Sequence, residues 1–95
     1  MGTYKLTQAA AADFEHIFDF GIDTFGLEQA LAYQNGLKQR FDELSEQPEL
    51  FPAVEHLRKG YRRSSYGSHA IYYGIEEGGV VIVRILGQQN LEKAF

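Results

Sequence analysis

His69 is the side chain in this sequence whose type and surroundings best suit acid–base chemistry. It opens a segment of alternating polar and apolar character, and three tyrosines lie close to it in the sequence, Tyr66, Tyr72 and Tyr73. A general base needs an orienting partner and a substrate proton within hydrogen-bonding reach. Because the sequence shows neither, we interpret His69 as a structural or binding residue in preference to a catalytic one.

Metal and cofactor sites are not expected in this chain, and neither is a catalytic centre. His16 and His56 are distant from His69 in the sequence, and there are no cysteines, so no ligand spacing typical of a zinc site occurs. No glycine-rich phosphate-binding loop is present either. The absence of cysteine fits a reducing compartment, and we therefore expect a cytoplasmic protein.

A basic cluster interleaved with aromatic residues is the second group that could do chemistry. It consists of Arg58, Lys59, Tyr61, Arg62, Arg63 and Tyr66. Cations beside aromatic rings can hold phosphates and stack nucleic-acid bases. Alternatively, these residues are solvated strand ends that pair with acidic helices elsewhere in the fold. The sequence leaves both interpretations open.

The net charge of −4 is divided unequally along the chain. Residues 1–55 hold ten acids against three bases, whereas residues 56–95 hold six bases against three acids. A dedicated nucleic-acid-binding domain is usually basic throughout. The observed division instead suits a protein whose C-terminal part meets an acidic partner.

Two helices are predicted from apolar residues that recur with a period of 3.6, the first from Gln8 and the second from about Leu27 to Glu46. The first stripe is Phe14, Ile17, Phe18, Ile22 and Phe25, and the second is Ala30, Tyr33, Leu37, Phe41 and Leu44. Gly26 stands between the helices, and Pro48 follows the second. This arrangement predicts an antiparallel helical hairpin in which Gly21 admits a close neighbour.

Four strands are predicted, at residues 3–6 and then, where the period falls to two, at 61–66, 69–75 and 80–86. Two helices can cover only one face of such a sheet. The 95 residues are therefore expected to form one α+β domain, β-α-α-β-β-β, with the hairpin on one face of a mostly antiparallel sheet. Residues 47–60 are predicted to be a loop with one short helical turn.

Strict alternation in the last strand places its side chains on two apolar faces. Val81, Val83 and Ile85 share one face, and Val80, Ile82, Arg84 and Leu86 share the other. If the helices cover one face, the second is left for another segment or for a partner, because an uncovered apolar face on a small protein is a binding signal.

The order of these motifs resembles the ParE branch of the RelE/ParE superfamily, the toxins of bacterial toxin–antitoxin pairs. The most specific motifs are Gly60-Tyr61-Arg62, Gly67-Ser68-His69 with Ile71 and Tyr73, and Val83-Arg84-Ile85-Leu86. Weaker ones are Tyr4-Lys5-Leu6-Thr7 with Asp13, Phe25-Gly26, Asn35-Gly36-Leu37 and Gln47-Pro48-Glu49-Leu50. Together they cover nearly the whole chain in order.

The resemblance implies a non-catalytic toxin that inhibits DNA gyrase and is neutralised by a ParD-like antitoxin in a hetero-oligomer. We expect the antitoxin to cover Val80, Ile82 and Leu86, with Arg84 paired to one of its acids. The residues expected to face the target are Arg58, Arg62, Arg63, His69 and Gln88.

Two alternatives remain open within the same superfamily. The RelE branch cleaves mRNA on the ribosome and typically carries an arginine shortly after the glycine that ends the last strand. Here the strand leads into Gly87, Gln88, Gln89 and Asn90, and a neutral amide supplies no fixed charge to a phosphate. The same segment departs from the usual ParE pattern, so a toxin-fold protein that has lost toxicity is the other alternative.

Overall fold

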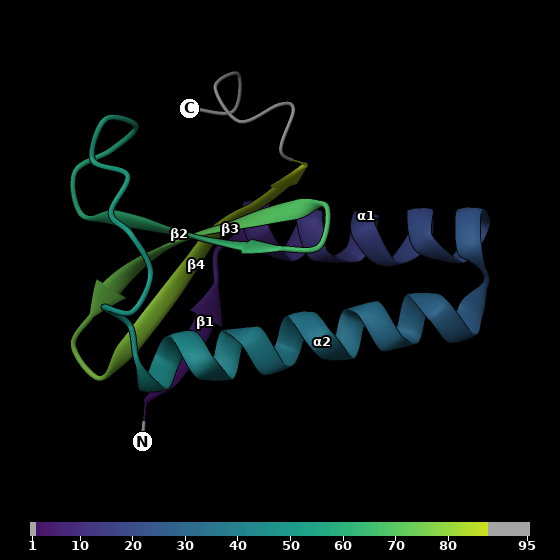
Figure 1. The fold of residues 1–95 in the computed structure, drawn as a ribbon, viewed down its shortest axis with the longest axis horizontal. Helices are drawn as coiled ribbons and strands as arrows, with labels where there is room; N and C mark the ends of the chain where they lie inside the picture. Colours follow the sequence, from purple (N-terminus) through teal and green to yellow (C-terminus); the bar gives the residue numbers. More distant parts are fainter. Residues whose placement is uncertain (1, 88–95) are drawn as a thin grey trace.

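The computed structural model describes residues 2–87 of the chain. The elements follow in the predicted order: β1 (Thr3–Leu6), α1 (Gln8–Phe25), α2 (Leu27–Glu46), β2 (Tyr61–Tyr66), β3 (His69–Glu76) and β4 (Gly79–Gly87). In Figure 1 the two helices run side by side, cross the sheet at one end and extend beyond it at the other. The predicted fold class, α+β with a helical hairpin on a mostly antiparallel sheet, is confirmed.

The helical hairpin begins and turns at residues that the sequence marks for those roles. Thr7 Oγ1 accepts the Ala10 N–H at 3.0 Å, which caps α1. Gly26 joins the helices with a φ of 96°, a conformation that favours glycine. A Cβ at Gly21 would lie 3.2 Å from the Ala30 Cβ, so the predicted close approach is confirmed. No helix within residues 2–87 is long and apolar enough to cross a membrane.

The four strands form one sheet in the order β1-β4-β3-β2. The pairs β2–β3 and β3–β4 are antiparallel hairpins, and β1 lies parallel to β4. The parallel pairing follows from the helical hairpin, which returns the chain to the same end of the sheet before the three-strand meander begins. β1 is short and pairs with only the first half of β4, so among the described residues no strand adjoins the outer edge of β4 beyond Ile82.

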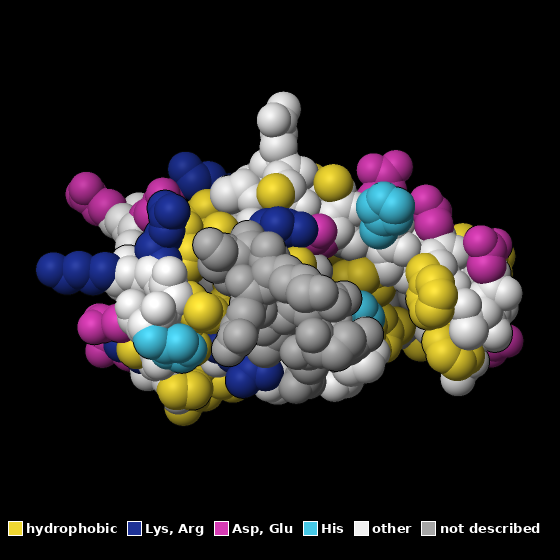
Figure 2. All heavy atoms as spheres, turned by 90° about the horizontal axis from the view of Figure 1, so that it is seen from above, with side chains coloured by type: hydrophobic (Ala, Val, Ile, Leu, Met, Phe, Trp, Pro, Cys, Tyr) yellow, Lys and Arg dark blue, Asp and Glu magenta, His cyan; other side chains and the backbone are white. Residues whose placement is uncertain are grey.

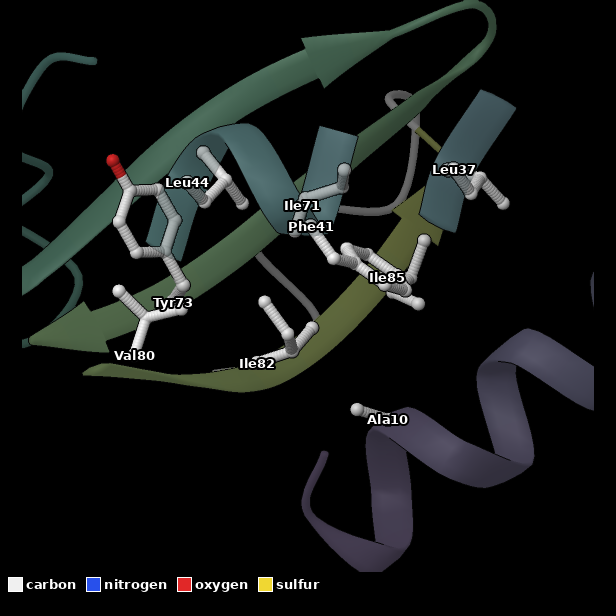
Figure 3. Close-up of a cluster of buried hydrophobic side chains, with 9 residues drawn as sticks. All are labelled: Ala10, Leu37, Phe41, Leu44, Ile71, Tyr73, Val80, Ile82 and Ile85. Carbon is white, nitrogen blue, oxygen red and sulfur yellow. The ribbon is translucent and has the colours of Figure 1, made fainter. Parts of the chain in front are cut away.

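The main core lies between the hairpin and one face of the sheet (Figure 3). Its buried members come from both layers: Ala10, Leu37, Phe41, Leu44, Ile71, Tyr73, Val80, Ile82 and Ile85. All five predicted apolar positions of α2 are buried or half-buried. The predicted apolar stripe of α1 ends in an exposed residue, Phe25, which is 64% exposed. The hairpin is therefore longer than the sheet, and its far end extends beyond the surface that the described strands offer for packing.

A bulge in β4 overturns the predicted distribution of its side chains. Arg84 pairs with Tyr72 and Ile82 pairs with the next residue, Tyr73. Val83 is therefore an extra residue in β4 with no paired residue in β3. The extra residue reverses the alternation, and Val80, Ile82 and Ile85 all enter the main core. The prediction that Val80 and Ile82 share a face with Leu86 was therefore wrong.

The second face of the sheet is partly covered by the chain's own loop. Val54 and Leu57 pack against a small cluster formed by Ala70, Tyr72 and Leu86. Backbone hydrogen bonds hold this loop in place, from the Val54 N–H to the Tyr61 carbonyl at 2.8 Å and from the Arg63 N–H to the Pro52 carbonyl at 3.1 Å. The loop thus also shields the edge of β2.

Candidate functional site

Arg84 is bound to Asp13 where the outer edge of β4 meets α1. Its Nε and Nη2 donate to the two Asp13 carboxylate oxygens at 2.7 and 3.0 Å, the geometry of a bidentate ion pair. Asp13 Oδ2 also accepts the Ile85 N–H at 3.0 Å. Hydrogen bonding to Asp13 raises the pKa of Arg84. The Asp13 carboxylate therefore balances the charge of Arg84 and also accepts a backbone N–H at the edge of β4.

The structure shows where the four residues predicted to meet the antitoxin lie, and three of them are buried. Val80 and Ile82 are only 2% and 0% exposed, because the bulge turns them into the core. Leu86 is also buried, in the smaller cluster on the other face. Of the four predicted residues, Arg84 alone keeps substantial exposure, with 29% of its side chain accessible, and its charge already has a partner in the same chain.

His69 lies in a cluster of hydrogen-bonding groups beside α2. Its Nδ1 is 2.7 Å from Tyr33 Oη and 3.4 Å from Ser68 Oγ, and Tyr33 Oη also donates to the Tyr66 carbonyl at 3.1 Å. A phenol holds one proton, so while Tyr33 donates to that carbonyl, Nδ1 must carry its own proton and donate to Oη. Burial lowers the pKa of His69, against an opposing effect of the Asp13 carboxylate.

The predicted basic target face is divided by the fold. Arg62 Nη1 donates to the Phe51 and Glu49 carbonyls at 2.7 and 3.4 Å, so it anchors the loop. Arg58 is exposed on that loop and lies 5.9 Å from the centre of the Tyr61 ring. Both are at the opposite end of β2 from His69. Arg63 is half-buried on β2, and Gln88 lies outside the described residues.

Arg40 is a structural residue that the sequence analysis missed. Its guanidinium lies between the rings of Phe51 and Tyr66, 5.4 and 5.3 Å from their centres. It donates to Ser64 Oγ at 2.7 Å and to the Ser65 carbonyl at 2.8 Å. No short-range pattern marks this role, since its partners lie up to 26 positions away in the sequence. Arg40 fixes β2 and the loop to α2.

These contacts limit the chemistry available to the described residues. His69 can exchange a proton, but the Arg84 charge is balanced by Asp13 and Arg62 donates to backbone carbonyls. Stabilising a phosphate transition state needs preorganised cations directed at the reacting group. Residues 2–87 also hold no cluster of three potential metal-ligating side chains. Within the described residues, Arg62 and Arg84 are therefore both engaged by partners in the same chain.

The fold, with its ion pair between β4 and α1, defines a class of small α+β proteins in which a helical hairpin packs on a sheet. One chain of the chromosomal ParDE system from P. aeruginosa has this fold, with a TM-score of 0.76 over 92% of this chain and 96% of that one, at 21% identity. Residues 4–91 match the family described as the ParE toxin of the type II toxin–antitoxin system parDE. The chain belongs to this family of toxins.

Two relatives bear the same family name. Toxin ParE1 of Mycobacterium tuberculosis is 37% identical over 87 residues, which cover 90% of this chain and 89% of the relative. Toxin ParE1 of Caulobacter vibrioides is 35% identical over 94 residues, covering 99% and 97%. The sequence-based prediction of a ParE-like toxin is confirmed by these matches and by the family match.

Proposed function

We propose that this toxin acts by binding DNA gyrase and inhibiting it, and that a ParD-like antitoxin holds it inactive. Membership of the ParE family is the observation that carries the proposal. The placement of its cations supports binding over mRNA cleavage, since Arg62 and Arg84 serve contacts within the chain. Arg58, exposed on the loop, and His69 remain proposed target contacts.

The antitoxin is proposed to bind at the outer edge of β4, beside Arg84. Within residues 2–87 no strand adjoins this edge beyond Ile82, and the Asp13 side chain occupies it in place of a backbone partner. An acidic residue of the antitoxin would compete with Asp13 for the accessible part of Arg84. Under this proposal Asp13→Asn strengthens antitoxin binding, since it frees the guanidinium; weaker binding would contradict it.

A supercoiling assay tests the target. Purified protein is added to gyrase, relaxed plasmid and ATP, and we expect loss of supercoiling or accumulation of cleaved DNA, reversed by the antitoxin encoded in the neighbouring reading frame. Relaxation by a type I topoisomerase is the control for an effect on the DNA itself. No effect on gyrase at any concentration would refute the target, and codon-specific mRNA ends in a toeprint assay would establish the ribonuclease alternative.

A further inference from the structure

A groove lies between the two helices and the turn that joins β2 to β3. Its volume is about 270 Å³, and its lining is mostly apolar. The side chains that shape it are Ile17, Phe20, Phe25, Ala30, Tyr33 and His69. Gly21 also lines it, and a Cβ at this position would lie 3.2 Å from the Ala30 Cβ. The groove is therefore built by the packing of the hairpin.

The hairpin end beside this groove exposes large apolar side chains. Phe20, Phe25, Leu27 and Leu31 are 65, 64, 56 and 41% exposed, and together they account for four of the six exposed large hydrophobic residues within positions 2–87. A large apolar side chain left in water forgoes the favourable free energy that its burial would release. A concentration of such residues beside a groove marks an interaction surface.

The same end of the hairpin is strongly acidic. Residues 15–31 contain Glu15, Asp19, Asp23 and Glu28 and no lysine or arginine. All four carboxylates are exposed, and none forms an ion pair with another residue in the described part of the chain. Figure 2 shows acidic and hydrophobic side chains together at this end of the visible face, with no Lys or Arg among them. The apolar surface thus lies in a negative field.

We propose that this groove and the hairpin end bind a protein segment that carries apolar anchors flanked by lysine or arginine. Apolar side chains of the partner fill the groove beside Phe20 and Phe25, and its cations meet the carboxylates around them. A second copy of this chain is disfavoured, because two acidic ends would repel each other. The surface is separate from the Arg84 edge and does not depend on gyrase being the target.

Three synthetic helical peptides of roughly 18 residues, about five turns, test the proposed chemistry. The first has leucines along one face and lysines elsewhere, the second replaces each lysine with glutamate, and the third scatters the leucines of the first around the helix. We expect only the first to bind tightly, with affinity that falls as salt rises. Equal binding of the second or third peptide, or none by the first, would overturn the proposal.

Two matched variants locate the binding surface. Phe20→Ala removes an exposed anchor from the groove, and we expect it to weaken the basic peptide on the order of tenfold, as a central interface residue does. Leu50→Ala removes a side chain of similar exposure, 63%, beyond the opposite end of α2, and should leave binding unchanged. Equal effects of the two variants, or self-association that depends on Phe20, would contradict the assignment.

Discussion

Arg84 and Asp13, 71 positions apart in the sequence, form a bidentate ion pair that ties the last strand to the first helix. The pair lies where β1 has ended and β4 would otherwise present an open edge, and the Asp13 carboxylate takes the Ile85 N–H as well. Edges of this kind recruit other strands unless they are blocked. The ion pair therefore joins the two layers of the fold and closes part of the sheet at the same time.

Asp13→Ala should lower the free energy of unfolding by about 2 kcal/mol, because it leaves a half-buried guanidinium and a backbone N–H without their acceptor. Urea denaturation of the purified protein measures the change. Asp19→Ala, at an exposed position on the same helix, is the matched control and should have little effect. A loss at position 13 no larger than that at 19 would show that the pair contributes nothing to stability.

Gly36→Ala should destabilise the protein although alanine is the better helix former. A Cβ at this position would collide with the Tyr66 hydroxyl, which packs directly on the helix backbone. Overpacking of this kind costs about 1–3 kcal/mol. Asn35→Ala, at an exposed neighbouring position, controls for helix propensity. Tyr66→Phe in the Gly36→Ala background should restore part of the loss, and a double-mutant cycle without coupling would exclude the collision.

The stability of the protein should fall as the pH is lowered below the ordinary pKa of histidine, about 6.5. Burial lowers the pKa of His69 in the folded state, so as the pH falls the unfolded chain binds this proton first and is stabilised relative to the fold. The destabilisation begins near pH 6.5 and is complete once the pH is below the folded-state pKa. Denaturation midpoints from pH 8 to 5 should show a weaker pH dependence for His69→Gln than for His16→Gln, whose histidine is exposed on α1.

Sequence periodicity predicted each element within about one residue, because the helix and strand periods are local and Thr7, Gly26 and Gly67 mark the boundaries. The Val83 bulge could not be predicted in the same way. A bulge depends on the partner strand, and one inserted residue reverses every face assignment beyond it. The face assigned to Val80 and Ile82 therefore failed although their strand was correct.

The contacts of the candidate site were not visible in the sequence for a related reason. Asp13 and Arg84 each belong to a family motif, but their pairing depends on how the hairpin docks on the sheet. The groove was also missed, since it forms where the apolar stripe of α1 continues past the sheet to Phe25. A stripe longer than the predicted strands can cover is the signal that indicates such a surface.

Arg40→Lys should lower the free energy of unfolding although the charge is kept. The planar guanidinium fits between the Phe51 and Tyr66 rings while it donates to Ser64 Oγ and the Ser65 carbonyl, and an ammonium cannot reproduce this combination. The expected loss is about 1–2 kcal/mol. Arg58→Lys is the matched control, because Arg58 faces a single ring from an exposed loop. Hydrogen exchange of the β2 amides should also rise in Arg40→Lys alone, since Arg40 holds this edge strand to α2. Equal stability and exchange in the two variants would show that the strand is held by its pairing with β3 without help from Arg40.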